Sequence, residues 1–81
     1  MMKQEIRITV KLFSDLRQFG PAISTIRVPK YATINFLLDT YQIPREKKDL
    51  MIFVNGLPHH KVNYFLNDGD VVAIFPPTAG G

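Results

Sequence analysis

The sequence predicts an α+β domain in which one main helix packs on one face of a single mixed sheet of about five strands. Three patterns predict it: apolar and polar residues alternate over 5–13, apolar residues recur at helical spacing after Thr33, and short apolar runs occupy 50–54 and 71–75. With 81 residues the chain can build one core only. The single helix must therefore cover the sheet, since no other segment is large enough.

The first strand is expected over residues 5–13, EIRITVKLF. The side chains predicted to face the core are Ile6, Ile8, Val10 and Leu12, and those predicted to face the other, wet side are Arg7, Thr9, Lys11 and Phe13. Residues 14–21, SDLRQFGP, are expected to form a turn or a single helical turn closed by glycine and proline. The shorter segment 22–28, which Pro29 ends, is then expected to be an edge strand hairpinned to the first.

The helix is expected to begin after Thr33, whose side chain is a good N-cap. The apolar residues that recur on one helical face are Ile34, Leu37, Leu38 and Tyr41. The helix should end near Gln42, because Pro44 disfavours helical geometry at the residue before it. A charged connection, REKKD, follows.

The second half of the chain predicts three strands. The run LMIFV at 50–54 is followed by Asn55-Gly56, a strong hairpin signal, and Pro58 places the short partner strand at an edge. A turn at 67–70 leads into the last strand, VVAIF, at 71–75. If the first and last strands pair in the middle of the sheet, the architecture is a β-grasp, or ubiquitin-like, fold, whereas a small barrel is the alternative. The domain is expected over 1–75, with an extended tail over 76–81.

Composition narrows the function classes. The chain has no cysteine, so it offers neither a disulfide nor a thiolate. Its net charge is +3, but the basic residues are dispersed and only Arg45, Lys47 and Lys48 cluster, beside Glu46. This is typical of a solvated surface rather than of a nucleic-acid site. No apolar run approaches the roughly 20 residues of a membrane span, so we expect a cytoplasmic protein without a membrane partner.

The polar residues do not form a familiar catalytic constellation. His59 and His60 are adjacent, so on a strand they point to opposite faces, which does not suit a metal site. Asp68 and Asp70 flank a glycine and could be paired carboxylates or calcium ligands, but a turn explains them equally well. The chain alone is therefore not expected to be catalytic or to bind a metal or cofactor.

The closing residues FPPTAGG are the most suggestive segment. Prolines favour an extended path and cannot continue a sheet, so Pro76 to Gly81 would form a semi-rigid arm that reaches at most roughly 20 Å. Such an arm suits the activation of its own carboxylate as an acyl-adenylate inside another protein. Gly80 and Gly81 have no Cβ to crowd a narrow channel or the reacting carbonyl. A disordered tail is the alternative.

A docking surface is predicted beside this arm. If the strands at 5–13 and 71–75 are parallel neighbours, Phe13 and Phe75 lie together at their carboxyl ends, on the wet face. An exposed aromatic pair is a plausible interface anchor, with Arg7 and Lys11 as rim charges that steer an acidic partner. Alternatively, local loops cover one or both rings.

Several segments resemble the ubiquitin-like sulfur-carrier family, and within it the small subunits of molybdopterin synthase. These segments are ITVKLFSDLR, VNG, LNDGDVVAIFPP and the closing AGG. The Gly-Gly end is shared with thiamine-pathway carriers and ubiquitin-like modifiers, whereas FPP favours the molybdopterin branch. The residues around LPHHK and KVNYF match only loosely, which leaves partner contacts there in doubt.

The resemblance implies a mechanism. A partner adenylyltransferase, similar to ubiquitin-activating enzymes, uses ATP to adenylate Gly81, and sulfur transfer then gives a terminal thiocarboxylate. The tail enters the large subunit of molybdopterin synthase, where the thiocarboxylate supplies sulfur to cyclic pyranopterin monophosphate to form the dithiolene. In this scheme Gly80 and Gly81 are the reactive end, Phe13 is an interface residue, and the threading segment consists of Phe75, Pro76, Pro77, Thr78 and Ala79.

Three alternatives remain at this stage. The chain could be a sulfur carrier for the thiamine pathway or another thiolation pathway. It could be a ubiquitin-like modifier whose Gly81 is joined to lysines. It could also be a non-covalent binding module with an incidental tail.

Overall fold

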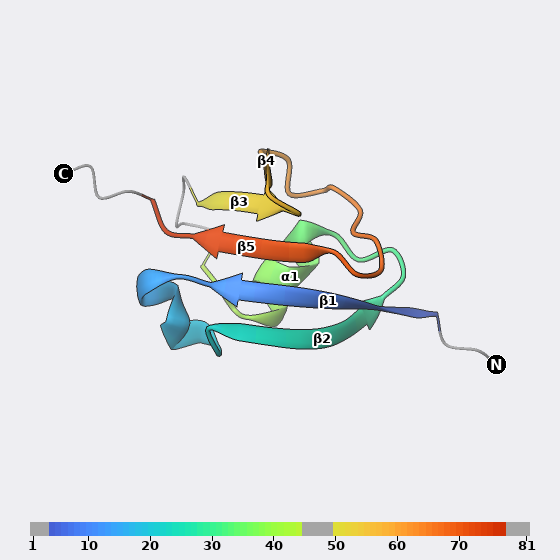
Figure 1. The fold of residues 1–81 in the computed structure, drawn as a ribbon, viewed down its shortest axis with the longest axis horizontal. Helices are drawn as coiled ribbons and strands as arrows, with labels where there is room; N and C mark the ends of the chain where they lie inside the picture. Colours follow the sequence, from blue (N-terminus) through green and yellow to red (C-terminus); the bar gives the residue numbers. More distant parts are fainter. Residues whose placement is uncertain (1–3, 45–49, 78–81) are drawn as a thin grey trace.

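The computed structural model describes residues 4–44 and 50–77 and shows one five-stranded mixed sheet with a helix on one face (Figure 1). The elements in chain order are β1 (Glu5–Leu12), the 3-10 helix η1 (Ser14–Phe19), β2 (Ile23–Pro29), α1 (Ile34–Thr40), β3 (Met51–Val54), β4 (Leu57–His59) and β5 (Val71–Phe75). The strand order is β2-β1-β5-β3-β4. The predicted α+β class and β-grasp arrangement are confirmed, with β2 one residue later in the chain at each end than predicted.

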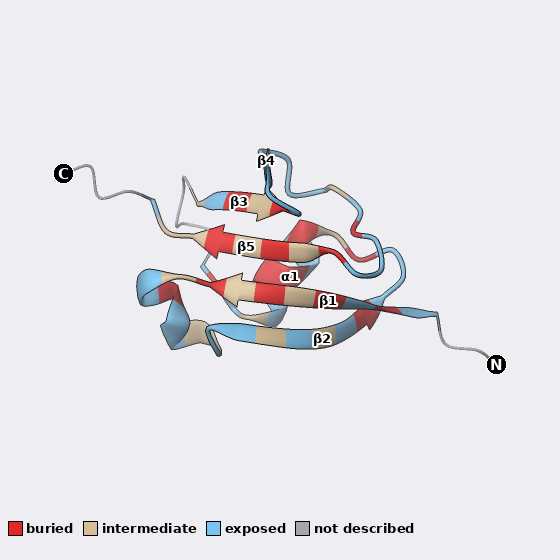
Figure 2. Ribbon diagram, in the orientation of Figure 1, coloured by how far each residue is buried: buried red, intermediate tan, exposed pale blue. Residues whose placement is uncertain are grey.

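The first and last strands occupy the middle of the sheet. β1 pairs in parallel with β5 and antiparallel with β2, and β5 pairs antiparallel with β3. The register places Val10 beside Val72, and Ile52 beside Ile74. Figure 2 shows the result as alternating buried and more exposed bands along β1, β3 and β5. One face of the sheet thus packs against α1. We call the opposite face, where the more exposed side chains lie, the open face.

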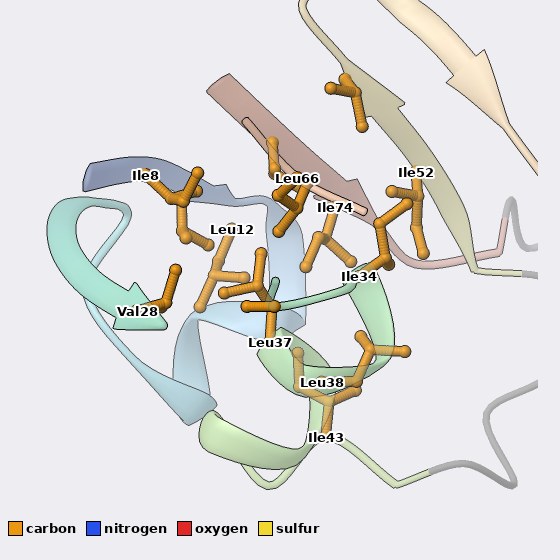
Figure 3. Packing of buried hydrophobic residues seen from close by; sticks show 14 of the residues in the cluster. Ile8, Leu12, Val28, Ile34, Leu37, Leu38, Ile43, Ile52, Leu66 and Ile74 are labelled. Carbon is orange, nitrogen blue, oxygen red and sulfur yellow. The ribbon is translucent and has the colours of Figure 1, made fainter. Parts of the chain in front are cut away.

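The core lies between the sheet and α1 (Figure 3). The largest side chains that are completely or almost completely buried are Ile8, Val10, Leu12, Leu16, Val28, Ile34, Leu37, Val72 and Ile74. Most come from the alternation that the sequence shows. Truncating such a side chain to alanine typically costs about 2–5 kcal/mol of unfolding free energy, so this layer fixes how the strands are placed.

Helix α1 begins as predicted but ends earlier. The Thr33 hydroxyl accepts from the backbone N–H of Phe36 at 3.2 Å, which is an N-cap bond. The helix ends at Thr40, because Gln42 takes a left-handed φ of 57° and the backbone N–H of Ile43 donates to the carbonyl of Leu38 at 2.9 Å. This is a Schellman motif, which buries Ile43 against the core. No helix in the described segments has the length and apolarity to cross a membrane.

The predicted hairpin joins β3 and β4. Asn55 and Gly56 have φ values of 52° and 85°, the left-handed pair that a tight two-residue turn between strands requires. β4 is a short edge strand that contains Pro58, as predicted. It also contains His59, whereas His60 lies just beyond it. The charged connection at 45–49 lies outside the described residues.

Candidate functional site

Three aromatic rings cluster on the open face of the sheet, where β1 and β5 end. The rings of Phe13 and Phe75 stack with centroids 4.1 Å apart and planes 12° from parallel. Phe53 of β3 meets the ring of Phe75 edge-on, with centroids 5.6 Å apart. The predicted pairing of Phe13 with Phe75 is therefore confirmed, and the parallel register of β1 and β5 is its cause.

Phe53 is a member that the sequence reasoning missed. Ile52 and Val54 are buried on the helix side, so Met51 and Phe53 point to the open face. The register then places Phe53 beside Ala73 of β5, so that this one strand lies between Phe53 and Phe13. The signal was present in the alternation, but a continuous apolar run such as LMIFV also suits a strand buried on both faces.

The cluster is half-buried rather than openly exposed. Phe75 packs on both Phe13 and Phe53, and each of the three side chains keeps part of its surface exposed. Beside them, Met51 leaves 45% of its surface exposed and a shallow hollow opens between the rings and Pro76. We call these residues, Phe13, Met51, Phe53, Phe75 and Pro76, the docking face.

The two predicted rim charges lie at different distances from this docking face. Lys11 is half-buried and stands two residues before Phe13 on the same side of β1. Arg7 is exposed, but it lies six residues from Phe13, about 20 Å along the strand. It stands opposite Arg27 of β2 and lines a separate polar hollow with Asp68. The structure thus places Lys11 near the cluster and Arg7 far from it.

The arm leaves the sheet at the docking face. The backbone N–H of Phe13 donates to the carbonyl of Ile74 at 3.2 Å. Pro76 and Pro77, which lack an N–H group, then carry the chain away from β5. Thr78, Ala79, Gly80 and Gly81, the rest of the predicted threading segment and its reactive end, lie outside the described residues.

Three of the four polar residues considered as catalytic or metal ligands, Asp68, Asp70 and His59, have structural partners. The carboxylate of Asp70 accepts from the side-chain amide of Asn55 at 2.9 Å and from the backbone N–H of Asn67 at 2.8 Å. Asp68 accepts from the backbone N–H of Arg7 at 2.8 Å. The ring of His59 packs on that of Tyr64, with centroids 4.2 Å apart. Within residues 4–44 and 50–77, no three side chains of metal-ligand type come together.

A comparison with protein families decides the identity of the chain. The model of the ThiS family matches residues 10–81. This chain belongs to the ThiS family. It is thus a ubiquitin-fold sulfur carrier of the class that its sequence resembles. No curated protein matches the chain in sequence.

Solved structures give this ThiS-family chain three informative neighbours. A putative molybdopterin converting factor, subunit 1, from Pyrococcus furiosus is 30% identical, with 90% of this chain and 99% of that chain covered and a TM-score of 0.72. Small archaeal modifier protein 1 from H. volcanii is 22% identical over 90% of this chain and 99% of that chain, with a TM-score of 0.76. A chain from the complex of subunits 1 and 2 of molybdopterin-converting factor from Helicobacter pylori is 22% identical over 94% and 100%, with a TM-score of 0.60.

Carriers and modifiers thus share this architecture. The modifier and the complexed subunit are too distant in sequence to establish more than the fold for this chain. The fold alone therefore does not separate the pathways.

Proposed function

We propose that this ThiS-family chain is the small, sulfur-donating subunit of a molybdopterin synthase. The observation that carries the proposal is the position of the aromatic cluster at the root of the FPP arm, in a chain 30% identical to a putative molybdopterin converting factor subunit 1. The cluster provides an anchor, and the arm, which begins at the same end of β5, provides the reactive group. A carrier that must enter a partner's active site needs both.

The chemistry is assigned to the backbone carboxylate of Gly81. Its oxygen attacks the α-phosphate of ATP on a partner adenylyltransferase, which releases pyrophosphate and leaves an acyl-adenylate. A donor then delivers sulfur at the sulfide level to the carbonyl carbon, and AMP leaves with the electron pair of the broken C–O bond. The product is a thiocarboxylate. Glycine suits this position, because a Cβ would crowd both attacks.

The second transfer takes place in the large subunit. The sulfur of the thiocarboxylate attacks a side-chain carbon of cyclic pyranopterin monophosphate, and the new carbon–sulfur bond replaces a carbon–oxygen bond, whose oxygen stays on the opened phosphate or leaves as water. Water then cleaves the acyl–sulfur bond, which restores the carboxylate and leaves sulfur on the pterin. A dithiolene carries two sulfurs, so two thiocarboxylate groups are used for each molecule of product. The chain itself therefore contributes the acyl group and the geometry of its delivery.

The docking face sets that geometry. Phe13 and Phe75 are fixed by paired strands, so they lose little conformational entropy when a partner covers them. From Phe75 the remaining six residues span at most roughly 20 Å. The partner's catalytic pocket must then lie within that distance of its contact with the aromatic cluster.

Intact-mass measurement tests the proposal. The chain is incubated with the adenylyltransferase of its native cell, ATP and a sulfide source, and then with the large subunit and cyclic pyranopterin monophosphate. We expect a species heavier by the difference between sulfur and oxygen, which disappears as the pterin gains sulfur. A chain that lacks Gly81 serves as the control and should gain no mass.

Other outcomes reject the proposal in distinguishable ways. A thiocarboxylate that forms but never reacts with the pterin would assign the chain to another thiolation pathway. Isopeptide conjugates between Gly81 and lysines of other proteins would favour a modifier. If no adenylyltransferase of the native cell supports formation of the thiocarboxylate, the remaining interpretation would be a non-covalent binding module.

A further inference from the structure

A second aromatic surface lies away from the docking face. Tyr31, just after β2, and Phe65, before β5, expose 70% and 62% of their surfaces. Their rings meet edge-on, with centroids 6.5 Å apart. We call this pair the aromatic ledge. Two large apolar side chains left in water beside each other carry an unfavourable hydration cost that an interaction surface would relieve.

The backbone holds Phe65 outward. On one side of it in the chain, Leu66 is buried, and its N–H donates to the carbonyl of Ala32 at 2.9 Å. On the other side, the carbonyl of Tyr64 accepts from the N–H of Ile34 at 3.2 Å, at the start of α1. Because both neighbours are tied to the fold, Phe65 cannot turn into the core without breaking these bonds. The ledge is therefore preorganised, so that binding a partner would cost little conformational entropy in this part of the chain.

Hollows open on both sides of Phe65. One lies between Phe65, Tyr31 and Lys30, with Ile6 and Leu66 in its lining. The other lies between Phe65 and Tyr64, with His59 and Lys61 in its lining. Both linings are mainly apolar in accessible surface. Each hollow can thus take an apolar side chain against the ring of Phe65.

The charge around the ledge is basic. The ammonium group of Lys30 lies 5.7 Å from the ring centroid of Tyr31, and Lys61 stands beside the second hollow. The carboxylate in these linings is that of Asp68, one oxygen of which already accepts from the backbone N–H of Arg7. A second copy of this chain, with a net charge of +3, would bring like charges together. Acidic groups on a different protein are the complementary match.

The ledge and the docking face lie at opposite ends of the sheet. Ile6, which lines a ledge hollow, is at the start of β1, and Phe13 follows its end. Seven residues of extended strand separate them by about 23 Å. Figure 1 shows the same separation, since the connection from β4 to β5 lies toward the end of the sheet where β5 begins, away from the arrowhead where β5 ends. A partner on one surface leaves the other accessible.

We propose that the aromatic ledge binds an acidic segment of a partner protein, with an apolar side chain seated beside Phe65 and carboxylates facing Lys30 and Lys61. Such a partner binds while the docking face and arm are engaged elsewhere. The proposal does not depend on sulfur chemistry at Gly81. It would hold for a carrier and for a modifier alike.

Amide chemical shifts of the isotope-labelled full chain provide the test. The probe is the synthetic peptide acetyl-Glu-Asp-Leu-Phe-Asp-Glu-amide, and the control peptide has lysine at each acidic position. We expect the acidic peptide to shift the amides of residues 30–31 and 64–66. Phe65→Ser should weaken binding about tenfold. Ile23→Ser removes a side chain of similar exposure, 64%, at the far end of β2 and should leave the affinity unchanged.

Charge is tested separately. The double variant Lys30→Glu and Lys61→Glu should weaken the acidic peptide, and added salt should weaken its binding to the wild-type chain. Unperturbed amide shifts elsewhere in each variant show that it is folded. The proposal is overturned by shifts confined to the docking face, by equal binding of the lysine peptide, by tighter binding of single-stranded oligothymidylate, or by no shifts at millimolar peptide.

Discussion

The two ends of strand β5 are built from different interactions. At its start, the side chains of Asn55, Asp68 and Asp70 hydrogen-bond to one another or to nearby backbone N–H groups, and at its end aromatic side chains pack on the open face. The polar groups at the first end are used in these bonds, so a partner at that end would contact the aromatic ledge beside them rather than these groups. The second end has half-buried rings, followed by Pro76 and Pro77, which have no N–H to donate to a ladder. The contrast distinguishes residues that build the fold from residues free to recognise a partner.

At the start of β5, hydrogen bonds of Asn55, Gly69 and Asp70 link three strands, and we call this set of bonds the clasp. The side-chain oxygen Oδ1 of Asn55 accepts from the backbone N–H of Val71 at 2.9 Å, while its side-chain nitrogen Nδ2 donates to the carboxylate of Asp70 at 2.9 Å. The N–H of Gly69 donates to the carbonyl of Arg7 at 2.8 Å, and Gly69 has a φ of 88° that favours glycine. These bonds tie β1, β3 and β5 together where β5 begins. The clasp adds to the strand pairing that brings Phe13 and Phe75 together.

The largest expected effect is at the reactive end. Deletion of Gly81 should abolish sulfur transfer to the pterin, because the remaining terminal glycine is one residue short of the partner's active site. The unfolding free energy should change by less than about 0.5 kcal/mol, since the last strand, β5, ends six residues earlier in the chain at Phe75. Sulfur-transfer assays and thermal unfolding check the two parts. Full activity of the shortened chain would show that Gly81 is not the sulfur carrier.

The next largest effect is at the clasp. Asp70→Ala should lower the unfolding free energy by about 3 kcal/mol, because the N–H of Asn67 and the amide of Asn55 lose their acceptors in a site where Asp70 is only 7% exposed. Thermal unfolding should then occur roughly 15 °C lower. Asp68→Ala, at an exposed residue with one such bond, is the matched control and should cost below about 1 kcal/mol. Equal losses in the two variants would contradict the clasp.

The third effect is at the docking face. Phe13→Ala should weaken binding of the large subunit by about 2 kcal/mol, or roughly 30-fold, because it removes the ring stacked on Phe75. Phe36→Ala removes an exposed ring on α1, on the other side of the sheet, and should leave the affinity unchanged. Calorimetric titration measures both. An unchanged affinity for Phe13→Ala would remove the aromatic cluster from the interface.

The smallest effect concerns steering. Lys11→Glu should slow association with an acidic large subunit several-fold, and the difference from wild type should shrink as salt is added. Lys30→Glu is the control. Lys30 follows the end of β2, far from the docking face, so its substitution should change the rate less. Stopped-flow association at several salt concentrations checks this. A larger effect of the Lys30 substitution would mean that the large subunit approaches the ledge instead.

Most of the fold could be predicted because its signals are local. Alternation along β1 and β5 indicates which side chains are buried, and Asn55-Gly56 requires a tight turn wherever it lies. The helix end was less accurate. Pro44 indicated a stop near Gln42, whereas the left-handed Gln42 and burial of Ile43 end the helix at Thr40. That motif depends on a contact with the core, which a local pattern does not contain.

The candidate site was predictable only in part. Phe13 and Phe75 follow from two alternating strands and one assumption about their pairing, which the parallel register confirms. The membership of Phe53 did not follow, because it requires the order of β5 and β3, which is a property of pairing between segments far apart in the chain. The distance of Arg7 from Phe13 was available in the sequence, since six residues of one predicted strand span about 20 Å.

By itself, the sequence determined the number of strands, the position of the helix and the buried face, because periodicity and turn chemistry act over a few residues. The Gly-Gly arm stays a prediction of the sequence. Only the tertiary structure decided which rings of the open face meet at the root of the arm and that Tyr31 and Phe65 form a separate ledge. The physical reason is that side chains from distant segments come together only when strand order and register are fixed. These depend on burial and hydrogen bonding across the whole sheet.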